Sequence, residues 1–135
     1  MKHFINFIFS LILITIILFQ GCDDTISQSA INEMVIPDSN VSYSMHIQKV
    51  FEAKCNRSGC HNSIDRAGDI SLVSWAETTA DYFILTPNEP DNSILVWAIE
   101  RRAGVSQMPP VSYPELTQNH IDGIRIWIDE GAENN

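Results

Sequence analysis

Positive charge is scarce in this sequence. Among its 135 residues, 8 are Lys or Arg and 17 are Asp or Glu, which gives a formal net charge of -9. DNA and RNA bind to proteins chiefly through Lys and Arg side chains that neutralise phosphates. The charge balance therefore argues against a nucleic-acid partner, and it weakly favours protein partners that have basic docking surfaces.

The sequence also lacks several motifs that mark enzymes. It has no internal repeat, no glycine-rich phosphate loop and no Ser, His and Asp arrangement that would indicate an activated nucleophile. Nothing in the chain therefore predicts nucleotide-dependent chemistry or serine-nucleophile catalysis.

Cysteine is rare, with three in the chain, and the first of them follows an apolar segment. After the basic start Met1-Lys2-His3, residues 4–19 form an almost unbroken apolar run. This run is short for a membrane span and typical of a secretion signal. The run leads into Gly21-Cys22, and the sequence around this pair resembles the cleavage box of bacterial lipoproteins. We therefore predict a signal peptide over 1–21 and a lipid on Cys22. An uncleaved membrane anchor is the alternative, and either one tethers the chain on the extracytoplasmic side of a bacterial membrane, in the periplasm or at the cell surface.

The rest of the chain divides into a polar segment and a domain. Residues 22–42 contain a proline and no helical stripe of apolar residues, so we predict a flexible, lipid-anchored tether. Residues 43–135 form the expected domain. A chain of this size buries little apolar surface, and a buried cofactor would add to its core.

Within the domain the apolar residues recur at helical spacing, so the predicted fold class is all-α. The first helix opens near Ser42 or Ser44, either of which can cap it, and it carries Ile47, Val50 and Phe51 on one face. The other predicted helices are a short one within 73–83, one from Ile94 to about Arg102, and one from Thr117 to Gly131. Gly123, inside the last of these, predicts either a close approach to another segment or a tolerated surface glycine.

The central motif of the domain is Cys55-Asn56-Arg57-Ser58-Gly59-Cys60-His61. Two cysteines followed at once by a histidine are a variant of the pattern that attaches c-type haem. The two thiols would add to the haem vinyl groups, and the histidine after Cys60 would reach the iron. Gly59 permits the tight backbone that the four intervening residues require.

A sixth iron ligand would come from the opposite face of the haem, and a thioether there raises the reduction potential. Met108 is the best candidate because it lies in a loop over 105–114 that three prolines keep from forming a helix. The weaker candidates are Met34, Met45, His46 and His120.

From the residues alone, two other interpretations of the motif stay open. Cys55 and Cys60 are also compatible with a structural disulfide, which an oxidising compartment favours. Together with His61, and with His46 or His120 as a fourth ligand, they are compatible with a zinc site as well.

A set of motifs that keep their order along 43–135 resembles a known family. The motifs are Ile47-x-x-Val50-Phe51-x-x-x-Cys55, Cys60-His61, Leu72, Pro87-x-x-Pro90-x-x-Ser93-x-Leu95, Met108-Pro109-Pro110 and Ile124-x-x-Trp127-Ile128-x-x-Gly131-Ala132. Together they resemble the small c-type cytochrome domains related to the planctomycete cytochrome c family. Similar domains occur in bacterial periplasmic and surface lipoproteins.

The resemblance implies a small helical cytochrome c fold wrapped around one covalently bound haem c. It implies that Cys55 and Cys60 attach the haem, and that His61 and Met108 are the axial ligands of its iron. The chain would then be an electron carrier and not an enzyme, with redox partner proteins in the periplasm or at the membrane. The family usually has two residues between the cysteines, and this chain has four. We expect one or two of the three tryptophans to line the haem crevice.

Two alternative functions remain at this stage. One is a peroxidase-like haem enzyme in which Met108 dissociates and leaves the iron open to a small substrate. The other is a non-redox lipoprotein module in which the cysteines form only a disulfide or a zinc site.

Overall fold

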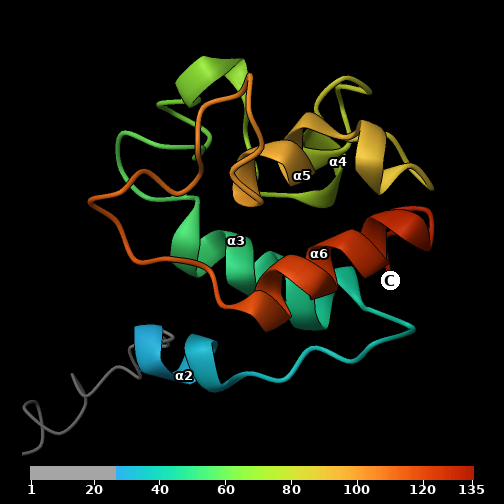
Figure 1. Ribbon diagram of the computed structural model, residues 1–135. Coiled ribbons are helices and arrows are strands. Elements are labelled where there is room, and N and C mark those ends of the chain that lie inside the picture. Colours follow the sequence, from blue (N-terminus) through green and yellow to red (C-terminus); the bar gives the residue numbers. More distant parts are fainter. Residues whose placement is uncertain (1–26) are drawn as a thin grey trace, which may run out of the picture.

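The computed structural model describes residues 27–135, in which helices surround a single core (Figure 1). The α-helices are α2 (Gln28–Glu33), α3 (Gln48–Lys54), α4 (Trp75–Thr78), α5 (Ile94–Ile99) and α6 (Gln118–Asp129). A π-helical turn, η1 (Tyr43–Ile47), and two 3-10 turns, η2 (Ala67–Asp69) and η3 (Pro90–Asn92), complete the elements. Residues 27–135 contain no β-strand, which confirms the predicted all-α class. None of their helices is long and apolar enough to cross a membrane. The predicted signal peptide and Cys22 lie outside the described residues.

The last predicted helix is confirmed, and it is the centre of the core. Thr117 caps α6, because its hydroxyl accepts the backbone N–H of His120 at 3.2 Å. The apolar stripe of α6 is fully buried at Ile124, Trp127 and Ile128. This stripe lies against η1 and α5, so α6 joins the first and second halves of the domain (Figure 1).

The first predicted helix is also confirmed, as η1 followed without interruption by α3. Ser42 caps its start by accepting the backbone N–H of Met45 at 3.2 Å. Ile47, Val50 and Phe51 are buried, as their spacing predicts. The helix ends at Lys54, so the first cysteine of the motif directly follows its last turn.

Helix α5 ends at Ile99, three residues before the predicted end at Arg102. Arg101 adopts a left-handed conformation with φ 60°, and the N–H of Arg102 bonds back to the Trp97 carbonyl at 2.9 Å. This is the hydrogen-bond pattern that ends many helices, although glycine usually occupies the left-handed position. The early end lengthens the loop that carries Met108.

An ion-pair network holds α5 and η3 against α6. The Asp91 carboxylate accepts from Arg102 at 2.8 Å and from Arg125 at 3.1 Å. Glu100 also binds both arginines, at 2.7 and 2.9 Å. Single exposed pairs contribute little stability, but here two carboxylates share two guanidinium groups across three elements.

The predicted flexible tether is wrong over residues 28–42, which are part of the fold. Helix α2 buries Ile31, and the chain that follows buries Ile36 and Val41, with exposures of 1–3 %. These residues show no helical period because each inserts singly into the core. The sequence criterion of an apolar stripe could not detect them.

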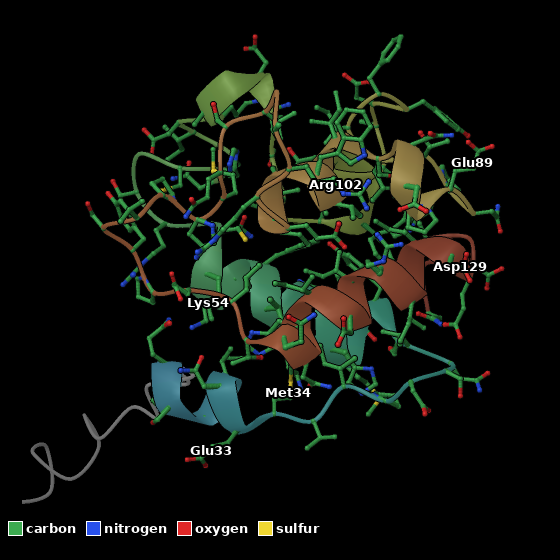
Figure 2. The ribbon with its side chains drawn as sticks, viewed as in Figure 1. Glu33, Met34, Lys54, Glu89, Arg102 and Asp129 are labelled. Atoms are coloured by element: carbon green, nitrogen blue, oxygen red, sulfur yellow. The ribbon has the colours of Figure 1, made fainter. Side chains whose placement is uncertain are left out.

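Polar contacts also tie α2 to the helices above it. The Lys54 ammonium at the end of α3 donates to Asn32 at 2.7 Å, and Figure 2 shows Lys54 on this side of α3. The Gln28 amide donates to the Ala53 carbonyl at 2.8 Å. Nε2 of His120, buried in α6, bonds to the Ile31 carbonyl at 2.9 Å. Helix α2 therefore packs against both α3 and α6 (Figure 1).

Gly123 marks a close approach, the first of the two interpretations of this residue. A Cβ at this position would lie 2.6 Å from Cγ2 and 3.0 Å from Cβ of Ile36. Ile36 is β-branched and buried, so its side chain has little freedom to move aside. Only a glycine lets the segment after α2 lie this close to α6.

We predict that Gly123→Ala destabilises the protein. Alanine gains about 1 kcal/mol of helix propensity, but overpacking costs about 1–3 kcal/mol, so the expected net loss reaches about 2 kcal/mol. Urea unfolding followed by circular dichroism measures this change. In an Ile36→Ala background the same substitution should be neutral or stabilising. An equal loss in both backgrounds would contradict the packing argument.

We also predict a pH-dependent contribution from His120. Its Nδ1 accepts the Thr117 N–H at 3.3 Å, so its proton is on Nε2, which donates to Ile31. Burial lowers the pKa of His120 from its ordinary value of 6.5. The unfolded chain therefore binds a proton at a higher pH than the folded one. The contribution of His120 to the free energy of unfolding is therefore fully present above pH 6.5. It is lost as the pH falls below 6.5 towards the lowered pKa of the folded state.

Unfolding measured at about pH 7.5 and about pH 5.5 brackets this range. His120→Gln keeps a side-chain amide near the Ile31 carbonyl and does not titrate, so it should lose stability less steeply than the wild type on acidification. Equal slopes for the two proteins would show that His120 does not contribute.

Candidate functional site

The segment between the two cysteines forms a closed turn after α3. The N–H of Cys60 bonds to the Arg57 carbonyl at 3.0 Å, and the N–H of His61 bonds back to the Cys55 carbonyl at 3.1 Å. Gly59 has φ 76°, the left-handed conformation that favours glycine. The four intervening residues thus bulge out, and His61 returns to the backbone of Cys55.

Asp65 braces this turn from outside. Its carboxylate accepts the Gly59 N–H at 2.7 Å and the Asn62 side-chain amide at 2.7 Å. The Gly59 N–H, and next the Asn62 amide, hold the pKa of Asp65 below its usual range. The same Asn62 nitrogen also donates to the Arg57 carbonyl at 3.0 Å. The turn therefore has a fixed shape that does not depend on a bond between the two sulfurs.

The loop that carries Met108 is attached at the end of α5. The N–H of Met108 donates to the Ala98 carbonyl at 3.0 Å, and the side chain packs against the core. Arg101, which precedes Met108, and Glu115, which follows it, form an ion pair that joins the two ends of the loop. These contacts hold Met108 on the inner side of the loop.

His61 and Met108 line one apolar cavity, although they lie far apart in the sequence. The cavity has a volume of about 330 Å³, and Cys55 also lines it. A smaller pocket of about 100 Å³ shares Cys55, His61 and Met108 with it and adds Cys60. The structure therefore gathers all four predicted residues around adjoining spaces. The cavity volume lies within the usual range for ligand sites.

Most of the remaining cavity wall was not predicted. It comes from α3, α5, α6 and the loops between them, and it is almost entirely apolar. The lining side chains include Phe51, Ile70, Leu72, Ile84, Leu95, Ile99, Val105, Leu116 and Ile124. In the loops, the sequence indicated the cavity wall only through isolated apolar residues such as Ile84, Val105 and Leu116.

The imidazole of His61 is unusual in making no hydrogen bond to any described residue. Its Nδ1 is buried and has no partner. Buried polar atoms normally have a hydrogen-bond partner, and those that do not call for an explanation, such as a functional role. His61 therefore does not serve as an ordinary hydrogen-bonded core histidine.

The two thiols are free and lie beside the cavity. Burial, and next the neighbouring Cys60, raise the pKa of the Cys55 thiol to about 12. The cysteines are not joined, in contrast to the disulfide interpretation. No three His, Cys, Asp or Glu side chains within 27–135 are grouped to hold a metal ion.

The weaker ligand candidates lie elsewhere. His120 is hydrogen-bonded to α2, and His46 Nδ1 accepts the Ser42 N–H at 3.1 Å. Met45 is 60 % exposed, and Met34 ends α2 below α6 (Figure 2). None of them lines the cavity.

The expectation that one or two tryptophans line the crevice is wrong, because none of the three contacts either space. Trp127 packs on Tyr43 with ring centroids 5.3 Å apart. The indole N–H of Trp75 donates to the Ala132 carbonyl at 2.7 Å, and that of Trp97 donates to the Asp91 carbonyl at 2.6 Å.

Comparison with known proteins gives one match. No curated protein and no solved structure matches the chain significantly. The family model described as planctomycete cytochrome C matches residues 58–112, a segment that begins after Cys55. This family implies covalently bound haem c. The segment that holds Cys60, His61 and Met108 is thus similar to the planctomycete cytochrome C family.

Proposed function

We propose that the protein is a membrane-tethered, extracytoplasmic c-type cytochrome that transfers electrons through one haem c. The observation that carries this proposal is the shared cavity of His61, Met108 and Cys55, with Cys60 in the adjoining pocket. A histidine and a methionine that face one apolar space are the ligand pair of electron-transferring haem proteins.

The residues present fit haem c. Cys55 and Cys60 would hold it through thioether bonds, and His61 and Met108 would be the axial ligands of its iron. The buried, unpartnered ring nitrogen of His61 and the apolar wall support this assignment. When bound, haem c supplies an iron that takes up one electron in its oxidised form and releases it in its reduced form.

The chain has three tasks in this chemistry. The apolar wall excludes water and lowers the local dielectric constant around the iron. Met108 presents a soft thioether, which favours the reduced iron and so raises the reduction potential. Fixed attachment of both ligand segments, at Cys55 and at Ala98, keeps rearrangement small when the charge on the iron changes.

The net charge of the chain favours transient partners of opposite charge. With a net charge of -9 the surface is acidic, so we propose redox partner proteins with basic docking surfaces. A lipid on Cys22 would hold the domain at a bacterial membrane, where such partners are to be sought.

The first test is Met108→Ala in protein made by a host that attaches haem c. The wild type should show a sharp reduced spectrum, a sulfur-to-iron absorption band when oxidised, and colour that stays with the polypeptide after acid-acetone extraction. The variant should lose the sulfur-to-iron band. Its reduction potential should fall by roughly 0.1 V, within the range of about 0.8 V that axial ligands span.

Met45→Ala is the matched control, since Met45 is exposed and does not line the cavity. It should keep both the band and the potential. An unchanged sulfur-to-iron band in Met108→Ala would show that Met108 is not a ligand of the iron. A colourless wild type, in a host that loads a control cytochrome, would refute the cytochrome itself.

The anchor has its own test. Protein extracted from membranes should lack residues 1–21 and carry lipid at Cys22, as measured by intact mass and fatty-acid labelling. Cys22→Ala should lose the label and retain residues 1–21, because the cleavage box needs the cysteine. An unlabelled, full-length wild type would instead indicate the uncleaved membrane anchor.

A further inference from the structure

Four buried side-chain atoms in the described part of the chain have no hydrogen-bond partner, and three of them belong to one neighbourhood. These three are Oδ1 of Asn56, Nδ1 of His61 and Oγ of Ser71. The fourth, Oε1 of Gln28, belongs to α2. A cluster of unpartnered polar atoms in an otherwise apolar region is unusual, because each atom costs free energy when it stays unbonded.

Leu72 joins the segments that carry these atoms. Its N–H donates to the His61 carbonyl at 2.9 Å, and its carbonyl accepts from Nδ2 of Asn56 at 2.9 Å. Ser71 directly precedes Leu72 and is 1 % exposed. The Asn56 amide and the Ser71 hydroxyl are thus both held beside the residue that pairs with His61.

The chemistry of the three atoms is complementary. A neutral imidazole that binds a metal through one nitrogen carries its proton on the other, so Nδ1 would be a donor when Nε2 binds iron. Because Asn56 uses Nδ2 to donate to Leu72, the oxygen of its amide is an acceptor. The Ser71 hydroxyl can accept and donate. One buried donor therefore has two unused acceptors in its neighbourhood.

We propose that Asn56 and Ser71 are positioning residues for His61. They accept the Nδ1 proton, directly or through one ordered water, and so fix the plane of the ring. Metal-bound histidines commonly have such a partner, which makes the ring a stronger donor to the metal. The inference rests on the proposed function, since it applies to a His61 that binds haem iron.

This proposal gives the segment between the cysteines a role. Asn56 is the first of the four residues that separate Cys55 and Cys60. It directly follows Cys55, and its side chain turns inward to Leu72 while Gly59 lies at the exposed side of the turn. The segment between the cysteines thus provides a bulge and, at Asn56, an acceptor for the histidine proposed to bind iron.

The test uses the full haem-loaded chain, with Asn56→Leu and Ser71→Ala as variants. A hydrogen bond from Nδ1 stabilises the oxidised iron, so its loss should shift the reduction potential upwards in both variants. Proton NMR of the reduced protein should show the Nδ1 proton exchanging with solvent about tenfold faster. Thr78→Val is the control, because it removes a buried hydroxyl that does not line the cavity. It should change neither measurement.

The outcomes separate this inference from the proposed function. An unchanged potential and exchange rate in both variants, with a normal haem spectrum and sulfur-to-iron band, would overturn the inference alone. A wild type that binds no haem would overturn the proposed function and the inference with it. If Asn56→Leu fails to fold, Ser71→Ala decides the question, because it removes a single oxygen.

Discussion

The hydrogen bond from the His61 N–H to the Cys55 carbonyl is the contact on which the site depends. Helix α3 fixes Cys55, because the helix face before it is buried in the core. The bond then brings His61 back to that fixed point, whatever the length of the turn between them. Leu72 extends the arrangement by pairing with His61, which sets one wall of the cavity. On the other side, the bond between the Met108 N–H and the Ala98 carbonyl ties Met108 to α5.

The parts of the fold that the sequence predicted share a physical property. In the first and last helices, several apolar side chains recur at helical spacing after a capping residue, Ser42 or Thr117. Local rules are sufficient there, because burial of one face decides the structure. The four residues predicted for the site come together because two of them are adjacent in the chain and Met108 lies in a loop that its prolines keep out of any helix.

What the sequence could not predict depends on contacts between distant segments. Ile36 is buried against α6, which lacks a side chain at Gly123. Ile31 is buried in α2, which packs on α3. Ile84 and Leu116 of the cavity wall lie in irregular segments, where apolar residues do not recur at a regular spacing. The three tryptophans indicated contacts with the core but not their position in the fold. Their indole N–H groups donate to backbone carbonyls away from the cavity.

The closed turn between the cysteines has a consequence for how such proteins are found. The match to the cytochrome family begins inside this turn and leaves Cys55 out. Surveys that search for haem proteins by a fixed interval between two cysteines would not consider this chain as a candidate. A criterion based on geometry, in which the histidine backbone pairs with that of the first cysteine, is indifferent to the interval. Inventories of candidate electron carriers in a genome would grow if they allowed this variation.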